Sequence, residues 1–195
     1  IHGWVRPLLE KLGFKAPPEL SREEGEGYKL ALLGFHRDAS SLLYNISRSD
    51  KELTSKTLVI DFNVALHEGI RATGATVKYG DLANPETLHH MGLSSAHVIV
   101  CTIPDDLLRG IDTKALVHVV REMAPNAVII ANAIATDEIK LVYEAGADYV
   151  YLNRFEAAWT LQRAIGAGLE QEIDTFRQKR QSRNWYKPDR KEILS

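Results

Sequence analysis

The stretch Tyr28–Ser41, YKLALLGFHRDASS, decides the fold that this 195-residue sequence predicts. The apolar run Leu30–Leu33 predicts a buried strand, Gly34 a tight turn, and Asp38 the start of a helix that ends near Ser49. In a doubly wound α/β fold, such a turn is where the phosphates of a nucleotide meet a helix N-terminus. The stretch therefore predicts the frame of a nucleotide site.

The turn matches the G-x-G-x-x-G pattern of dinucleotide sites only in part, because His36 and Ala39 replace its second and third glycines. The second glycine normally lets the backbone approach the pyrophosphate. Two outcomes follow. A protonated His36, helped by Arg37, could contact a phosphate. Alternatively, the imidazole blocks a dinucleotide, so that a mononucleotide or nothing binds. Asp38 adds a negative charge there, and we expect weakened or altered phosphate binding.

Strand and helix patterns alternate along the rest of the chain. Strands are expected at 29–34, 57–62, 76–79, 97–103, 127–132 and 148–152, and helices at 38–49, 64–73, 84–90, 104–123, 136–145 and from 155 onward. Six strands joined by short crossovers predict a parallel six-stranded sheet in the order 3-2-1-4-5-6. A ligand crevice is then expected at the carboxyl ends of strands one and four.

The two ends of the chain differ in composition from its middle. Residues 1–27 predict a short amphipathic helix and a linker rich in proline, glycine and acids, and residues 28–168 form the α/β domain. Residues 169–195 predict a charged helical tail that ends loosely. The final helix of the domain is expected to direct five apolar side chains inward: Ala158, Trp159, Leu161, Ile165 and Leu169.

Polar side chains at strand ends supply further candidates. Asp61 ends the second strand, where an acid accepts hydrogen bonds from ribose hydroxyls and favours NAD or an adenine nucleotide over NADP; alternatively it caps the next helix. Asn63 could add a contact to the ribose or base. Asp81 either contacts an adenine amino group or is a turn residue. The full set of candidate binding residues is Gly34, Phe35, His36, Arg37, Asp38, Ala39, Asp61, Asn63, Gly80, Asp81, Thr102 and Ile103.

Composition and missing motifs exclude several functions. The net charge of −2 gives no electrostatic case for nucleic acid, and no apolar run is long enough to span a bilayer. The single cysteine, Cys101, lies in an apolar run and is expected to be buried. The sequence has no Tyr-x-x-x-Lys pair, P-loop or serine nucleophile elbow, and His89-His90 has no partner at metal-ligand spacing. We therefore predict no catalytic residue, no metal site and no enzyme.

Four segments of the chain together resemble a known family. They are YKLALLGFHRDAS, TLVIDFN, VKYGDLANPETLHHMGLSSAHVIVCTIPDD and AVIIANA with LVYEAGADYVYL. This family is the regulatory RCK domain, also called KTN or TrkA-N, of potassium channels and transporters. The cytosolic carboxyl-terminal domain of Kef-type cation/proton antiporters is the most similar variety, over about residues 28–168. The sequence departs from the family at His36 and Ala39, and at Asn132, where an arginine is common.

The resemblance implies a Rossmann-like regulatory domain of a potassium or other monovalent cation/proton antiporter or channel. Such a domain gates transport when an adenine nucleotide (AMP, ADP, ATP or NAD(H)) binds in the crevice. It implies a homodimer through the helix at about Arg154–Gly168, with Phe155 and Trp159 as anchors. Ile1–Lys15 would then descend from a transmembrane transport domain, at the cytoplasmic face of the cell membrane.

Two alternatives stay open. GDLANPETL is also similar to extended short-chain dehydrogenases, which would make the chain an NAD-dependent oxidoreductase or epimerase. The missing Tyr-x-x-x-Lys pair and the absence of a substrate-binding part argue against this reading. The other alternative is a degenerate Rossmann domain that dimerises and binds no nucleotide.

Overall fold

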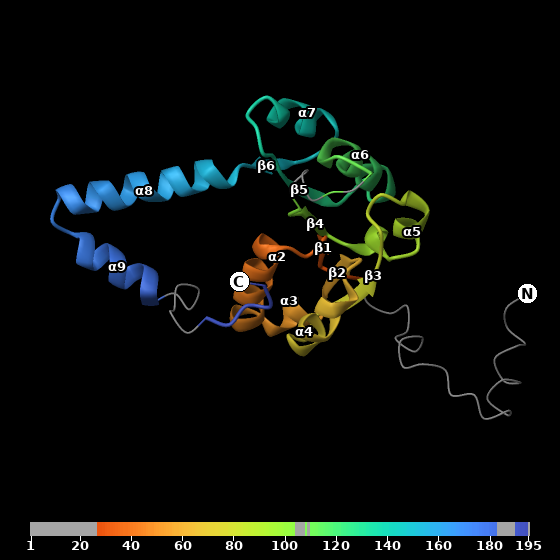
Figure 1. Ribbon diagram of the computed structural model, residues 1–195, viewed down its shortest axis with the longest axis horizontal. Coiled ribbons are helices and arrows are strands. Elements are labelled where there is room, and N and C mark those ends of the chain that lie inside the picture. The colour runs from red at the N-terminus through yellow and green to blue at the C-terminus, as the bar shows by residue number, and fades with distance from the viewer. Residues whose placement is uncertain (1–26, 104–107, 109, 183–189, 195) are drawn as a thin grey trace, which may run out of the picture.

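The computed structural model describes residues 27–103, 108, 110–182 and 190–194 (Figure 1). The expected amino-terminal helix lies outside the described residues. The strands are β1 (Leu30–Leu33), β2 (Thr57–Asp61), β3 (Thr76–Tyr79), β4 (Val98–Cys101), β5 (Val128–Asn132) and β6 (Tyr149–Tyr151). The helices are α2 (Arg37–Ser49), α3 (Lys51–Ser55), α4 (His67–Ala72), α5 (Pro85–His89), α6 (Thr113–Met123), α7 (Glu138–Glu144), α8 (Asn153–Leu169) and α9 (Ile173–Ser182), with short 3-10 turns at Val64–Leu66 and Leu93–Ser95.

The six strands form one parallel sheet in the order β3-β2-β1-β4-β5-β6, which confirms the predicted Rossmann-like topology. In the central strand, Leu33 is in register with Ile60 of β2 and with Cys101 of β4. The strand order reverses between β1 and β4, so the chain that leaves the carboxyl end of β1 continues into one half of the sheet and the chain that leaves β4 continues into the other. This is the position at which doubly wound folds bind ligands.

Successive side chains of a strand point to opposite faces of the sheet, and each face has its own core. On one face, Leu33 and Ile99 pack with Leu116 of α6, and α5 and α7 complete the layer. On the other face, Leu32 packs with Leu43 of α2, and Ile70 of α4 completes the layer. Fully burying one such aliphatic side chain contributes roughly 1.5–3 kcal/mol, which explains why nearly every position of the central strands is apolar.

The expectation of one continuous helix from Pro104 to Met123 is wrong, because α6 begins at Thr113; residues 104–107 and 109 lie outside the described residues. Gly110 has a φ of +78°, which a continuing right-handed helix does not allow. The Asp112 carboxylate then accepts a hydrogen bond from the Ala115 N–H at 2.8 Å and caps the helix. The expected helix 64–73 is likewise shorter and follows a 3-10 turn, and α3 was not expected.

The expected inward orientation of the last domain helix is wrong. Helix α8 follows the edge strand β6 and leads away from the sheet (Figure 1), and none of its residues is buried. Trp159 is 58% exposed and Leu169 is 82% exposed. The reason is topological: β6 is the last strand of this sheet along the chain, so α8 does not have to cross back over the sheet to a further strand.

The charged tail expected over 169–195 contains α9, and its last described residues, the returning segment 190–194, lie against α2 (Figure 1). The Arg190 guanidinium donates hydrogen bonds to the Ser41 carbonyl and to Asn45 Oδ1, both at 2.9 Å. It also lies 4.5 Å from the centre of the Tyr44 ring. These contacts cover the outer side of α2.

Two further hydrogen bonds and an apolar contact hold the returning segment. Glu192 accepts a hydrogen bond from the Ser41 hydroxyl at 2.6 Å, and the Leu194 N–H donates to the buried Ser40 hydroxyl at 2.9 Å. Ile193 packs with the α2–α4 face of the core. The carboxyl-terminal end of the described chain is therefore part of the folded body.

Candidate functional site

The turn between β1 and α2 depends on Gly34. This residue has a φ of +75°, in the left-handed region that L side chains rarely adopt. A Cβ at this position would also fall 1.8 Å from Ile103 Cδ1, so that packing as well as conformation requires glycine. Its N–H donates to the Ile60 carbonyl at 2.8 Å. The turn is thus fixed to β2 on one side and covered by the end of β4 on the other.

Asp61 ties the turn to β2. Its two carboxylate oxygens accept hydrogen bonds from the N–H groups of Phe35 and Asn63, each at 2.7 Å. His67 Nε2 lies 3.1 Å from the main-chain oxygen of Asp61. The side chain is buried, and burial raises the pKa of its carboxyl group above the ordinary value, although the two N–H donors oppose this. Asp61 therefore orders the turn, and its predicted contact with a ribose stays a prediction.

The first residues of α2 face two different surroundings. His36 is the N-cap and makes no side-chain capping bond, and Arg37 is exposed. Ala39 is completely buried, which lets α2 lie close to the sheet. The Asp38 carboxylate accepts a hydrogen bond at 2.7 Å from the side-chain amide of Asn153, the first residue of α8. The first turns of α2 and α8 are thus joined by this bond.

The end of β4 is held by neutral groups. Asn132 on β5, with its amide nitrogen assigned toward β4, donates to the carbonyls of Cys101 and Ile103, both at 3.2 Å. Thr102 is buried, and its hydroxyl has no hydrogen-bond partner among the described residues. Cys101 is buried as expected, and burial raises the pKa of its thiol to about 12. The thiol is therefore protonated at neutral pH.

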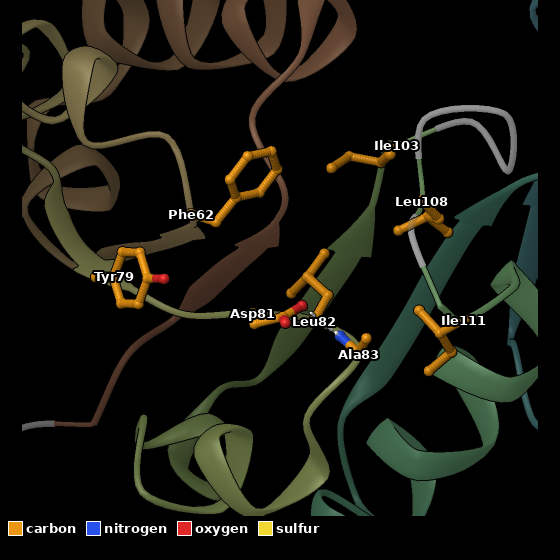
Figure 2. A pocket seen from close by; sticks show the side chains of 8 residues that line it. All are labelled: Phe62, Tyr79, Asp81, Leu82, Ala83, Ile103, Leu108 and Ile111. Atoms are coloured by element: carbon orange, nitrogen blue, oxygen red, sulfur yellow. Dashed lines mark hydrogen bonds between the residues drawn. The ribbon is translucent and has the colours of Figure 1, made fainter.

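A cavity of about 210 Å³ opens at the carboxyl edge of the sheet, between the ends of β2 and β3 and the segment that follows β4 (Figure 2). Figure 2 shows Phe62 and Tyr79 on one side of it and Leu108 and Ile111 on the other. Both aromatic rings are more than half exposed, so their surfaces are available to a ligand. The lining residues are Phe62, Tyr79, Asp81, Leu82, Ala83, Ile103, Leu108 and Ile111.

Asp81 supplies the carboxylate in this lining. It follows Gly80, where a Cβ would fall 2.6 Å from Ile60 Cγ2, so the chain passes close to β2. One carboxylate oxygen of Asp81 accepts a hydrogen bond from the Ala83 N–H at 3.0 Å, which fixes the side chain in the turn. An exposed carboxylate beside aromatic and aliphatic walls suits a flat ring that carries hydrogen-bond donors.

The structure brings the predicted residues together in two groups. Asp81 and Ile103 line the cavity, whereas Phe35, Asp61 and Asn63 form the hydrogen-bonded network below the turn. The remaining candidates do not line the cavity: Gly34, His36, Arg37, Asp38, Ala39, Gly80 and Thr102.

Sequence reasoning missed the aromatic and aliphatic walls of the cavity. Phe62 and Tyr79 stand directly beside the predicted Asp61 and Gly80, at the ends of two neighbouring strands. That position was a usable signal, because parallel strands end at a common edge of the sheet. Leu108 and Ile111 gave no comparable signal.

Two other classes of site are absent from the part of the chain that the structure describes. It holds no group of three or more His, Cys, Asp or Glu side chains placed to bind a metal ion. Of the helices it contains, none combines the length and the apolar character needed to cross a membrane.

The family model of the TrkA-N domain matches residues 30–153. The chain therefore belongs to the TrkA-N domain family, which confirms the resemblance to RCK domains. It is 29% identical over 130 residues to YbaL of Escherichia coli (strain K12), a protein named for cation/proton antiport. The match covers 67% of this chain and 22% of YbaL, so the chain spans about a fifth of that relative.

Solved structures agree with this assignment. The TrkA-N domain of the inner membrane protein YbaL from Escherichia coli superposes with a TM-score of 0.61 at 26% identity, over 71% of this chain and 97% of that domain. The GsuK channel bound to NAD gives 0.54 at 19% identity, over 75% of this chain and 25% of GsuK. GsuK bound to ADP gives 0.55 at 19% identity, over 76% and 37% of the two chains. The GsuK structures show the shared fold.

Proposed function

We propose that this chain is the ligand-sensing regulatory domain of a monovalent cation/proton antiporter or channel, and that an adenine nucleotide binds at the carboxyl edge of its sheet. The cavity between Phe62, Tyr79 and Ile111, with Asp81 beside it, carries the proposal. Two comparisons support it: YbaL is named for antiport, and GsuK has been solved with NAD and with ADP. The domain would act at the cytoplasmic face of the membrane, beside a transmembrane transport domain.

Each part of the lining would have a separate task toward the base. The rings of Phe62 and Tyr79 would stack on a planar heterocycle. Asp81 would accept a hydrogen bond from its exocyclic amino group. Leu108 and Ile111 would exclude water from the opposite side. The Asp61 network would keep the glycine turn in place, and Asn63 would reach the ribose.

Regulation requires two states of the molecule that bind the ligand with different affinity. We propose that the chain forms a homodimer through α8 and that two geometries of this dimer are the two states. Phe155, Trp159, Leu161 and Ile165 are all exposed on this helix, which is more apolar surface than a monomer usually leaves in water. The guanidinium of Arg163 lies 5.0 Å from the Trp159 ring and would border the contact. A ligand that binds one dimer geometry better than another would shift the transporter accordingly.

No catalytic role is proposed for this site. Tyr79 and Asp81 are the titratable side chains that line the cavity among the described residues, and the sequence lacks the Tyr-x-x-x-Lys pair that would position a tyrosine for proton transfer in a short-chain dehydrogenase. We therefore expect that the chain does not oxidise NADH when small carbonyl compounds are supplied as substrates. Turnover in that assay would favour the oxidoreductase alternative.

Thermal unfolding of the chain with AMP, ADP, ATP, NAD and NADH tests the ligand. A ligand at 100 times its Kd contributes about 2.7 kcal/mol, which raises the Tm by several degrees in a protein of this size. Tyr79→Ala should abolish the shift, whereas Tyr149→Ala, a matched exposed tyrosine on β6, should keep it. Failure of every nucleotide to raise the Tm would contradict the proposal and favour the platform that binds no nucleotide.

Sedimentation equilibrium tests the dimer separately. We expect the mass to rise from one to two chains with increasing concentration. A single species with the mass of one chain at all concentrations would contradict the dimer without affecting the ligand proposal.

A further inference from the structure

We infer that the crevice of this chain selects a nucleoside without a diphosphate, because its base-binding end is open while its phosphate-binding end is closed. This inference rests on the proposed function and narrows its ligand. The family pattern places a pyrophosphate against the glycine turn, and three features of this chain do not fit that group: a side chain that fills the turn, an anion at the helix start, and an amide already in use.

Ile103 fills the turn. Gly34 is the first glycine of the family pattern and forms the tight turn, beside position 36, where the second glycine would let a phosphate approach the backbone. In this structure Ile103 Cδ1 and Cγ1 lie only 1.8 Å and 2.2 Å from the point that a Gly34 Cβ would occupy. Ile103 is itself buried in the core cluster with Leu33 and Ile60, which holds it there. The space freed by the glycine is therefore used for apolar packing.

The charges around the turn also disfavour a phosphate. Asp38 places a carboxylate in the first turn of α2, where the helix dipole would otherwise attract an anion, and its bond to Asn153 keeps it there. His36 adds a Cβ where the family has glycine. Arg37 is the only Lys or Arg between residues 34 and 39, and its side chain is exposed.

Asn132 is neutral at a position where related sequences commonly carry a positive charge. It stands where RCK sequences commonly have arginine, and its amide nitrogen is engaged by the Cys101 and Ile103 carbonyls. A neutral amide in this position ties β5 to β4 and also fixes the residue that covers Gly34. The neutral side chain therefore offers no positive charge to a phosphate, and it holds the main chain of Ile103 beside the turn.

The end of the crevice that would hold the base has side chains suited to bind it. The cavity between Phe62, Tyr79 and Ile111 (Figure 2) has two exposed aromatic side chains in its wall and carries the Asp81 carboxylate. Its volume of about 210 Å³ is below the range of roughly 300–1,000 Å³ that is usual for larger ligands. Such a space accommodates a ring system and leaves the rest of a dinucleotide outside. Affinity should therefore come from the nucleoside.

Isothermal titration of the chain with adenosine, AMP, ADP and NAD tests this selection. We expect adenosine to bind at least as tightly as ADP and NAD, with AMP no tighter than adenosine. If ADP or NAD binds more than about tenfold tighter than adenosine, the inference is wrong and the proposed nucleotide sensor stands. If none of the four binds, both are wrong.

Substitutions at Ile103 test the closure itself. Ile103→Val removes Cδ1 and Ile103→Ala removes Cγ1 as well; both should raise the affinity for ADP relative to adenosine, by about tenfold for alanine. Ile46→Ala, at a partly buried isoleucine in the second half of α2, is the control and should leave the ratio unchanged. The valine variant keeps the test valid if the alanine variant unfolds. An unchanged ratio in a folded Ile103 variant overturns the inference.

His36→Gly restores the glycine of the family pattern. We expect it to strengthen NAD and ADP binding while adenosine binding stays the same. Weaker ADP binding would mean that His36 holds a phosphate, which also overturns the inference.

Discussion

Helices α2 and α8 have different surroundings. Both follow the carboxyl end of a strand, with 13 and 17 residues respectively. Helix α2 buries Ala39, Ser40 and Leu43 against the sheet, whereas α8 buries none of its residues. The difference comes from the path of the chain: α2 lies between β1 and its neighbour β2, whereas α8 follows β6, the last strand of the sheet. A helix that connects two strands crosses back over the sheet and becomes core, whereas a helix after the last strand can remain a contact surface.

The two helices also differ on their outer sides. Helix α2 is covered by the returning segment, through Arg190, Glu192 and Leu194. The apolar residues of α8 have no such cover, and we propose that a second copy provides it. The comparison therefore separates two properties: the stability of the folded domain and the association of two copies of the chain. Substitutions can test each property.

The largest effect on stability is expected from Leu43→Ala in α2. Leu43 is completely buried, and its truncation should lower the free energy of unfolding by about 2–5 kcal/mol. Leu161→Ala in α8 is the matched control and should change it by less than about 0.5 kcal/mol in dilute protein. Urea unfolding measures both. Equal losses of unfolding free energy in the two variants would show that α8 is part of the folded domain.

Trp159→Ala tests the other side of the comparison. As a central aromatic anchor, its removal should weaken dimerisation by at least about 2 kcal/mol, or roughly 30-fold in Kd, with little change in monomer stability. Thr160→Ala is the control, because helical spacing places Thr160 on the side of α8 away from the exposed apolar residues. Sedimentation equilibrium gives both constants, and an unchanged dimer Kd for Trp159→Ala would rule out this anchor.

Arg190→Ala should open the cover of α2. The loss of its two hydrogen bonds and of the contact with Tyr44 should cost roughly 1–2 kcal/mol of unfolding free energy. Lys191→Ala, an exposed neighbour, should cost less than about 0.5 kcal/mol. If the two variants unfold alike in urea, the returning segment contributes nothing to the stability of the body.

The smallest effect is expected from Gly168→Ala in α8. Nothing lies within 4 Å of the added Cβ, so the change acts through helix propensity alone, by at most about 1 kcal/mol. Because α8 is separate from the core, we expect slower amide hydrogen exchange in α8 and an unchanged free energy of global unfolding. A matching gain in global stability would contradict that separation.

Much of the fold could be predicted from the sequence, because buried strands read as apolar runs and short crossovers restrict the topology. The start of α6 could not, since Pro104 gave a plausible helix start and Gly110 overrides it. In the site, Asp81 and Ile103 were predicted from their strand-end positions. The contact between Ile103 and Gly34 was not, because side-chain packing between β1 and β4 leaves no local pattern.

The returning segment has a consequence for the order in which the molecule is made. The hydrogen bond between Leu194 and Ser40 joins residues 154 positions apart. At a synthesis rate of roughly 5–20 residues per second, a ribosome needs about 8–30 s to add that length. Helix α2 can form early on the nascent chain, but its outer side stays open to water and to chaperones until residues 190–194 emerge. The cover of the first helix of the described fold thus depends on residues translated about 150 positions later.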